Sequence, residues 1–302
     1  MDKLIKKIIE KNNPTVVGLD PNLDFIPQSI KRKHFDEDGC TLKAASKAIF
    51  DFNKEIIDAV ADIVPAIKPQ LAYYEMFGHN GITAFERTVK YAQLKGLYVI
   101  ADGKRNDIGT TMEAYATAFL GKIKISDLST EIFGTDALTV NGYLGTDGIL
   151  PLLKLCKEYN KSIFVLVKTS NKSSGELQDL CIDNIPVYAK MGDMCEQWGA
   201  DTIGEYSYSK VGAVVGATYP EQLTELRKRL PHTFFLVPGY GAQGGGAEGI
   251  RGAFDKNGLG AIVNSSRAIM CAYKAQNRPI DDFAECARIE AINMRDSLMG
   301  NR

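Results

Sequence analysis

Eight short apolar segments, spaced along almost the whole chain, constrain the fold more than any other feature of this sequence. Most of them are nearly continuous in apolar character, which is typical of parallel strands that are covered on both faces. The segments are 15–20, 63–69, 97–103, 135–140, 161–167, 211–216, 233–238 and 259–264. We expect each segment to form a strand.

Amphipathic helical patterns lie between the apolar segments. In residues 44–63, Ile49, Phe52 and Ile56 recur at spacings of three and four, which places them on one face of a helix. Further helical patterns cover 81–96, 219–231 and 281–300. Eight alternations of strand and helix predict an α/β fold, the (β/α)8 TIM barrel. A doubly wound open sheet is the alternative, although it usually has fewer strands.

The length of the chain would allow two domains, but α/β barrels of about 250 residues form one domain. We expect residues 1–302 to form a single barrel domain with enlarged loops after strands 1, 3 and 5. The extra residues are 21–44, 104–134 and 168–210. All three should leave the carboxyl ends of strands, the face where barrel enzymes place their active sites. Within the first of them, the mixed-charge run 31–39 is expected to be a solvated loop.

The composition limits the possible partners and compartment. Lys and Arg number 36 against 37 Asp and Glu, so the net charge of −1 provides no overall field to attract nucleic acid or an acidic membrane surface. The six cysteines contain no C-x-x-C pair, and no run of about 18 apolar residues occurs. The charged residues 1–14 lack the apolar core of a signal peptide. We expect a cytoplasmic protein with free thiols that binds neither nucleic acid nor a membrane.

Polar residues follow the ends of most predicted strands. Asp20 ends the first strand and Lys68 lies near the end of the second. The third strand continues into ADGKRNDIG, which contains Asp102, Lys104 and Asp107. Because these strand ends would lie on one rim of a barrel, we expect the side chains to share a site. None of the three histidines ends a strand, which disfavours a Ser-His-Asp or Cys-His mechanism.

The D-x-K-x-x-D pattern is unusual at the end of a buried strand. Side chains alternate along a strand, so Asp102 and Lys104 point the same way if the strand continues regularly through Gly103. A Schiff-base lysine must lose its proton readily, whereas flanking carboxylates favour the ammonium form. Lys104 is therefore expected to donate a proton. The alternative is a purely structural set of ion pairs.

A glycine-rich loop, residues 239–244, matches the pattern G-x-G-x-x-G. The acidic residue that a dinucleotide fingerprint requires at the end of the next strand is absent. Loops after strands 7 and 8 of a barrel commonly bind phosphate. We expect the backbone of this loop, the amide of Gln243 and the guanidinium of Arg267 to bind a phosphate group. A merely flexible loop is the alternative.

Taken together, these residues resemble the orotidine 5′-phosphate decarboxylase family, and its longer bacterial branch is the most similar. The resemblance covers roughly residues 15–275 and rests on six motifs in the same order: VGLDP, AIKPQ, ADGKRNDIG, VKTSN, VPGYGAQGG and NSSRAI. It implies decarboxylation of orotidine 5′-monophosphate to uridine 5′-monophosphate in pyrimidine synthesis, with no cofactor and no metal. One departure is Ser266, because shorter members of the family often have glycine before the phosphate-binding arginine.

The resemblance also implies a role for each charged residue. Lys104 would protonate C6 of the pyrimidine, and Asp102 would lie against the carboxylate of the substrate. Lys68 and Asp20 would hold the charge network and contact the ribose. This assignment suits the chemistry, because loss of carbon dioxide leaves negative charge on a ring carbon beside which a fixed cation is needed.

The remaining roles concern the partner subunit and the rest of the substrate. Asp107, with Ile108 and Thr111, would reach into the neighbouring subunit's site, which implies a homodimer. The positions expected to bind the pyrimidine and the phosphate end are Thr169, Ser170, Pro238, Gln243, Ser266 and Arg267. Two other functions stay open: a Mg²⁺-dependent aldolase or decarboxylase of a sugar phosphate, and a barrel that only binds a nucleotide.

Overall fold

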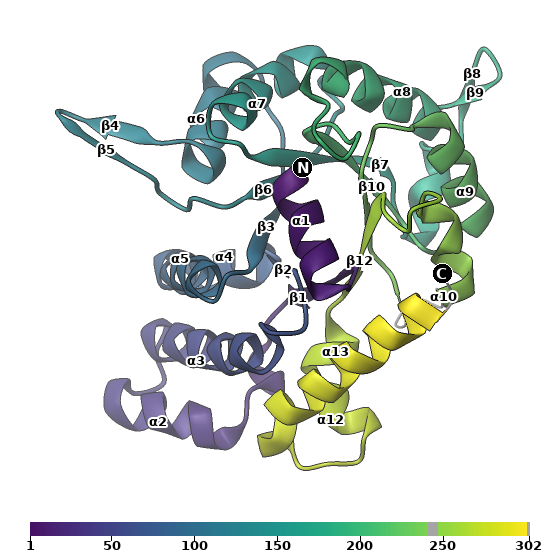
Figure 1. Ribbon diagram of the computed structural model, residues 1–302. Helices are drawn as coiled ribbons and strands as arrows, with labels where there is room; N and C mark the ends of the chain where they lie inside the picture. Colours follow the sequence, from purple (N-terminus) through teal and green to yellow (C-terminus); the bar gives the residue numbers. More distant parts are fainter. Residues whose placement is uncertain (241–246, 301–302) are drawn as a thin grey trace.

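The computed structural model of the protein describes residues 1–240 and 247–300. Eight parallel strands form a closed barrel in the order β1-β12-β11-β10-β7-β6-β3-β2 (Figure 1). The strands are β1 (Thr15–Leu19), β2 (Ala66–Pro69), β3 (Tyr98–Arg105), β6 (Ala137–Val140), β7 (Ser162–Lys168), β10 (Val211–Val215), β11 (Phe235–Val237) and β12 (Ala261–Ser265). The predicted α/β barrel is confirmed, and each of the eight apolar segments contributes one strand.

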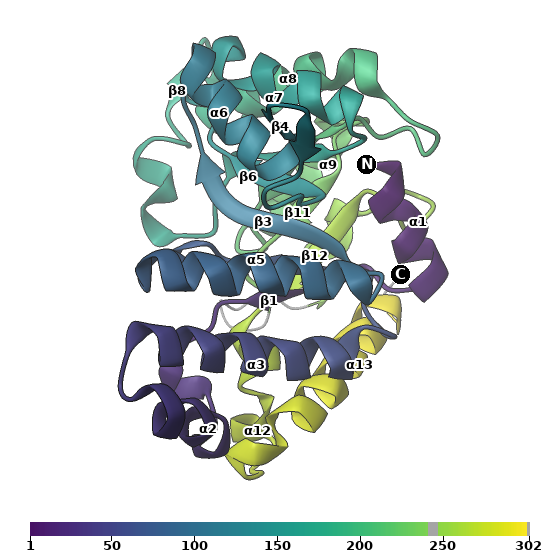
Figure 2. The ribbon, with the colours of Figure 1, turned by 90° about the vertical axis from the view of Figure 1, so that its left-hand side faces the viewer.

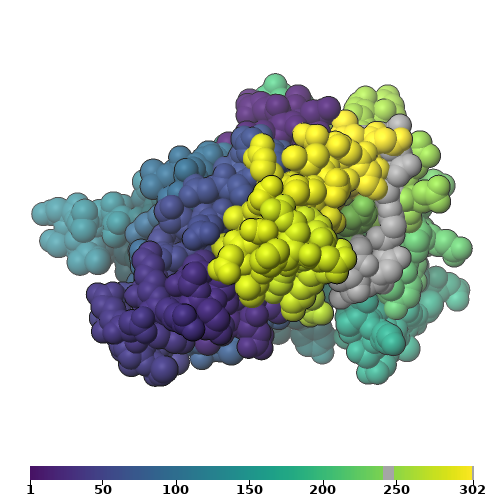
Figure 3. Space-filling model, turned by 90° about the horizontal axis from the view of Figure 1, so that it is seen from below, coloured from purple at the N-terminus to yellow at the C-terminus, as the bar shows by residue number. Residues whose placement is uncertain are grey.

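Helices surround this barrel. They are α1 (Asp2–Lys11), α2 (Gln28–Asp38), α3 (Leu42–Val60), α4 (Ala72–Glu75), α5 (Gly78–Leu94), α6 (Gly109–Leu120), α7 (Thr146–Glu158), α8 (Val187–Gly199), α9 (Pro220–Arg229), α10 (Ala247–Ile250), α11 (Arg267–Met270), α12 (Ala272–Ala275) and α13 (Phe283–Gly300). Figure 2 shows α3 and α5 side by side along the barrel. The rings of Phe52 and Phe283 stack with their centroids 4.7 Å apart and join α3 to α13. Helices α3 and α13 pack against each other, and Figure 3 shows the C-terminal part of the chain, in yellow, lying against the N-terminal part, in purple.

Helix α1 covers the amino-terminal end of the barrel. Its buried Leu4, Ile5 and Ile8 pack with inward-facing strand residues that include Tyr98 and Phe164. Burial of each such aliphatic side chain contributes about 1.5–3 kcal/mol to the free energy of folding. Figure 1 shows α1 lying across the barrel strands. This end is filled largely with apolar side chains, whereas Lys68, Asp102 and Lys104 lie at the opposite, carboxyl-terminal mouth.

The extra chain segments differ in where they lie. Residues 21–44 contain α2, and residues 168–210 contain a small hairpin, β8 (Cys181–Ile182) and β9 (Ile185–Pro186), followed by α8. In residues 104–134, however, the hairpin formed by β4 (Ile123–Ile125) and β5 (Leu128–Thr130) follows α6 and not β3. It projects away from the barrel (Figure 1). The expectation that all this length leaves the carboxyl end of a strand is therefore wrong for the hairpin.

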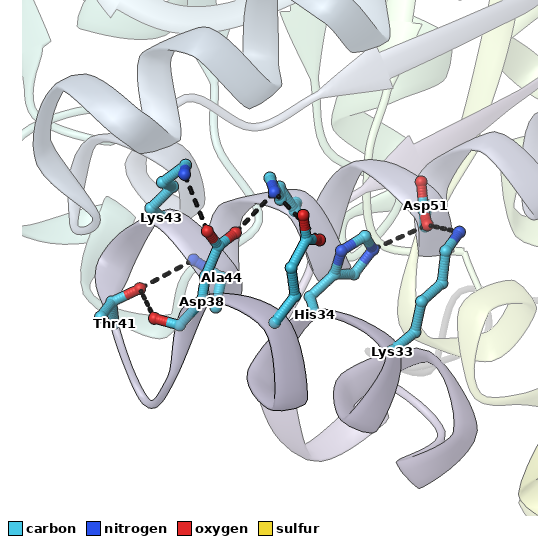
Figure 4. A network of polar contacts seen from close by, with 9 residues as sticks. Lys33, His34, Asp38, Thr41, Lys43, Ala44 and Asp51 are labelled. Atoms are coloured by element: carbon cyan, nitrogen blue, oxygen red, sulfur yellow. Dashed lines mark hydrogen bonds and ion pairs between the residues drawn. The ribbon is translucent and has the colours of Figure 1, made fainter.

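The mixed-charge run 31–39 is helical through Asp38 and is not a solvated loop. His34 is buried, and its Nε2 lies 2.8 Å from Oδ2 of Asp51 on α3, which also accepts from Lys33 at 2.6 Å. At the end of α2, Asp38 accepts a hydrogen bond of 2.7 Å from Lys43 (Figure 4). The charges are thus spaced to pair with the next helix, and they hold α2 against α3.

All six cysteines are free, and four of them are buried. Burial raises the pKa of the Cys156 thiol to about 12, so this side chain is a poor nucleophile at neutral pH. Within residues 1–240 and 247–300, no helix has the length and apolar character needed to cross a membrane.

Candidate active site

Asp102 is the centre of a charge network at the carboxyl ends of β2, β3 and β6. Its Oδ2 atom accepts hydrogen bonds from Lys68 Nζ at 2.8 Å and from Gln70 Nε2 at 3.0 Å. Its Oδ1 atom accepts from Lys104 Nζ at 2.7 Å and from Thr139 Oγ1 at 2.8 Å. Four donors from three neighbouring strand ends therefore fix the position of one carboxylate.

The electrostatic environment keeps this network charged. Asp102 is 7% exposed and Lys68 is 4% exposed. Burial by itself would raise the pKa of Asp102, but the ammonium groups of Lys68 and Lys104 outweigh it and hold that pKa well below its usual range. Burial would lower the pKa of Lys68, but the carboxylates of Asp102 and Asp20 outweigh it and raise that pKa. Asp102 and Lys68 are therefore both ionised at neutral pH.

The same shifts define how the network responds to pH. Because the pKa of Asp102 is lower in the folded state, its contribution to stability is present above the unfolded value of about 3.9 and is lost as the pH falls through the folded value. Because the pKa of Lys68 is higher in the folded state, its contribution is present below about 10.4 and is lost as the pH rises through the folded value. The network is stable across the neutral range.

Lys104 adopts a backbone conformation that is unusual for a side chain other than glycine. Its φ of 47° lies in the left-handed region, and the register between β3 and β6 shifts between Ala101 and Arg105. Its backbone N–H donates to Thr139 Oγ1 at 3.0 Å. The strand is therefore irregular beyond Gly103, so the regular alternation that would place Asp102 and Lys104 on the same side does not apply here. The ammonium still meets Asp102, and 45% of the Lys104 side chain is exposed at the barrel mouth. Backbone strain of this kind is concentrated at functional sites.

Two adjoining cavities open at this mouth and share Lys68, Asp102 and Pro238. The first, which we call the Lys104 cavity, has a volume of about 360 Å³ and is also lined by Lys104, Thr139, Leu166, Thr169, Ser170, Asn171, Val214 and Leu236. The second, the Arg267 cavity, has a volume of about 300 Å³ and is also lined by Asp20, Gln70, Gly239, Tyr240, Asn264, Ser265, Ser266 and Arg267. The charge network thus lies between a partly apolar cavity and a polar one.

The Arg267 cavity contains two buried acceptor atoms that need a donor. Neither Oδ1 of Asp20 nor Oδ1 of Asn264 has a hydrogen-bond partner among the described residues. A buried acceptor without a partner costs about 1–3 kcal/mol, so hydroxyl donors of a ligand would stabilise this site. Gly18 on β1 faces the same region, because a Cβ at this position would lie 1.9 Å from Ser266 Oγ. Only glycine there leaves room for the Ser266 side chain.

Comparison with known proteins identifies the family. Residues 16–278 match the model described as the orotidine 5′-phosphate decarboxylase / HUMPS family. The chain belongs to this family. The resemblance found in the sequence is therefore confirmed, and the two cavities are those of an orotidine 5′-phosphate decarboxylase / HUMPS family barrel.

Individual members of the family are similar over nearly their full length. Orotidine 5′-phosphate decarboxylase of Rhodopirellula baltica is 42% identical, with 97% of this chain and 96% of that protein covered. The enzyme of the same name from Clostridium perfringens strain SM101 is 44% identical, with 98% and 97% covered. The solved structure of Leishmania donovani OMP decarboxylase is 27% identical, has a TM-score of 0.71, and matches over 97% of both chains.

The family's expected site residues fall into two groups in this chain. Lys68, Asp102, Lys104, Thr169 and Ser170 line the Lys104 cavity, together with Pro238. Asp20, Ser266 and Arg267 line the Arg267 cavity. The expected segment of Asp107, Ile108 and Thr111 lines neither cavity. Asp107 instead accepts a hydrogen bond of 2.8 Å from the backbone N–H of Ile108, whose side chain is exposed. Gln243 lies outside the described residues.

Two residues of the network were not predicted as site residues. Gln70 follows Lys68 by two positions, so the alternation of side chains along an extended segment could have placed it at the same mouth. Thr139 lies next to the last residue of β6, in a strand that carries no charged residue near its end. A lone threonine in an apolar strand gives no signal in the sequence, although here it bridges Asp102 and the backbone of Lys104.

Proposed function

We propose that this chain converts orotidine 5′-monophosphate to uridine 5′-monophosphate and carbon dioxide, with Lys104 as the proton donor. The family and its curated relatives support the reaction. The roles that we assign to the residues rest on one observation. Asp102 pairs with two lysines, the buried Lys68 and Lys104 at the cavity mouth. This arrangement holds a protonated amine beside the place where a carboxylate leaves.

The two cavities suit the two ends of this nucleotide. The Lys104 cavity has apolar walls at Leu166, Val214 and Leu236, which suit the faces of a pyrimidine ring. In the Arg267 cavity, the Oδ1 atoms of Asp20 and Asn264, which have no partner among the residues that the structure describes, suit ribose hydroxyls. The guanidinium of Arg267 can bind a phosphate through two hydrogen bonds. We therefore place the base in the first cavity and the ribose phosphate in the second.

The reaction needs no electron carrier in this arrangement. The bond between C6 and the carboxylate carbon breaks, its electron pair stays on C6, and carbon dioxide leaves. The fixed ammonium of Lys104 stabilises the charge that develops on C6 and then transfers its proton there. Asp102 holds that ammonium in place, and its charge would also repel the substrate carboxylate in the ground state. Binding of the remote phosphate supplies energy that can appear in the transition state.

The second candidate, a Mg²⁺-dependent reaction of a sugar phosphate, is disfavoured by Lys68. Its ammonium lies 2.8 Å from Asp102, and its pKa is raised by both Asp102 and Asp20. A buried cation already compensates the carboxylates that a divalent ion would need.

Exhaustive chelation separates these two functions. After treatment with a chelator and removal of free metal, we expect turnover of orotidine 5′-monophosphate to stay unchanged, because the cation at the site is a side chain. The measurement is the initial rate before and after treatment, with and without added Mg²⁺. Loss of turnover that Mg²⁺ restores would contradict the cofactor-free assignment.

We also propose that the protein acts as a homodimer in which Asp107 reaches the neighbouring site. Large apolar side chains are exposed in the Asp107 segment and in the loop before α7: Ile108, Tyr143 and Leu144. The segment packs closely against the start of α7. A Cβ added at Gly148 would lie only 3.0 Å from the carbonyl oxygen of Asp107. Exposed apolar surface of this kind is typical of a protein interface.

A subunit-mixing experiment tests the shared site. Asp107→Ala and Lys104→Ala proteins should each be inactive, but a mixed dimer contains one site with both native residues. Random exchange of an equal mixture should therefore restore about one quarter of the wild-type sites. The rate is measured before and after exchange, with two affinity tags to confirm that mixed dimers form. Mixed dimers without any recovery would contradict a contribution of Asp107 in trans.

A further inference from the structure

Lys168, at the end of β7, is a fully buried charge that lines neither cavity. Its Nζ atom lies 2.6 Å from Oδ1 of Asp179 and donates to Ser174 Oγ at 3.2 Å. It also lies 4.7 Å from the centroid of the Tyr219 ring. A buried ammonium is strongly unfavourable without a partner. The segment between Lys168 and Asp179 must therefore stay folded back over the end of β7.

Gln178, the neighbour of Asp179 in the sequence, connects this segment to the wall of the Lys104 cavity. The side-chain amide of Gln178 binds Thr169 twice: its Oε1 accepts from the backbone N–H at 2.9 Å, and its Nε2 donates to Oγ1 at 2.8 Å. Thr169 Oγ1 in turn donates to Asn171 at 2.6 Å. Because Thr169 and Asn171 line the Lys104 cavity, the position of this wall depends on where Gln178 is held.

The rest of the segment is also tied to the barrel. It contains a short 3₁₀ helix, Lys172–Glu176, and leads into the β8–β9 hairpin beside α8 (Figure 1). The backbone N–H of Tyr188 on α8 donates to the carbonyl of Gln178 at 3.0 Å. The aromatic ring of Tyr188 lies 5.6 Å from Lys168 Nζ. Lys168 thus lies close both to Asp179 in the segment and to Tyr188 on α8, where the chain returns to the barrel.

We propose that Lys168 is a positioning residue for the pyrimidine wall of the active site, acting through Asp179 and Gln178. This inference rests on the proposed function, since it assigns the wall formed by Thr169, Ser170 and Asn171 to the pyrimidine. Lys168 touches no reacting group. It positions the side chains of this wall, which contact a part of the ring that is remote from the leaving carboxylate.

The test compares two buried lysines at opposite ends of the same strand. Lys168→Met removes the charge at the active-site end. Lys161→Met removes a buried lysine that donates to the Gly134 carbonyl at 3.0 Å near the start of β7. We expect Lys168→Met to raise KM for orotidine 5′-monophosphate by about ten- to a hundredfold with kcat changed less than about threefold, because ring binding is lost uniformly. Lys161→Met should leave KM unchanged even if it lowers the melting temperature.

Two further variants keep the inference testable if Lys168→Met does not fold. Gln178→Ala removes the contact with Thr169 without leaving a buried charge, and it should raise KM in the same way. Asp179→Asn acts on a partly exposed carboxylate and should raise KM in the same direction. A folded Gln178→Ala or Lys168→Met protein with wild-type KM would overturn the inference.

A second readout separates this inference from the proposed function. In Lys168→Met, amide hydrogen exchange in residues 169–182 should become faster than in wild type and in Lys161→Met. If wild-type protein fails to decarboxylate orotidine 5′-monophosphate but this exchange difference appears, the proposed function is wrong, whereas the structural part of the inference, that Lys168 holds residues 169–182 in place, stands. If the enzyme is active and exchange and KM are both unchanged in Lys168→Met, the positioning role is wrong.

Discussion

Replacement of Lys104 by alanine is expected to lower kcat for orotidine 5′-monophosphate by at least about 10⁴-fold and to leave a folded protein. The variant loses both the proton donor, an effect worth about 10²–10⁴-fold, and the cation beside C6, an effect worth about 10²–10³-fold. The side chain is 45% exposed and packs little, so its removal should not disturb the barrel. The measurement is kcat under saturating substrate, together with circular dichroism and the melting temperature.

An exposed lysine far from the site provides the control. Lys124 lies on the exposed β4 strand, which projects away from the barrel, so Lys124→Ala should keep the wild-type kcat. If Lys104→Ala retained a rate within tenfold of wild type, Lys104 would not be the proton donor.

The second large effect is expected for Asp102→Asn, on both stability and activity. This substitution removes the negative charge that Lys68 and Lys104 share, and Lys68 is only 4% exposed. Loss of one partner of a buried ion pair typically lowers the free energy of unfolding by about 3–5 kcal/mol. Because Lys104 also loses its anchor, kcat/KM should fall by at least about 100-fold. Urea unfolding and steady-state kinetics measure the two effects.

A matched substitution in a surface ion pair shows whether burial is the cause. Asp201 pairs with Lys157 at 2.6 Å, but both side chains are largely exposed. Asp201→Asn should leave the urea midpoint and kcat/KM at their wild-type values, since exposed pairs contribute little. Equal effects of Asp102→Asn and Asp201→Asn would contradict the central place of Asp102.

Much of the fold could be predicted from sequence because the barrel depends on a repeated local pattern. Each strand is buried on both faces, so its residues are apolar without interruption, and each helix shows a period of three to four residues. The prediction of a solvated loop at 31–39 was wrong because it considered only the local pattern of charges. The charges of this run pair with residues on α3, and such contacts between helices leave no local pattern.

Residues that line the candidate cavities could be predicted where they are charged and end a strand, as for Asp20, Lys68 and Asp102. Thr139 was missed because its role depends on an irregular backbone at Lys104, whose φ of 47° no periodicity predicts. The link from Lys168 through Asp179 to Thr169 was missed as well. It arises from a segment that folds back on itself, which only the three-dimensional structure brings together.

The central claim is that this site decarboxylates a nucleotide and does not merely bind one. The most direct test is the ultraviolet spectrum of orotidine 5′-monophosphate in the presence of the purified, chelator-treated protein, with Lys104→Ala as the inactive control. We predict that the spectrum changes to that of uridine 5′-monophosphate, with one carbon dioxide released per nucleotide, and that the Lys104→Ala sample stays unchanged. An unchanged spectrum with folded wild-type protein would contradict the claim.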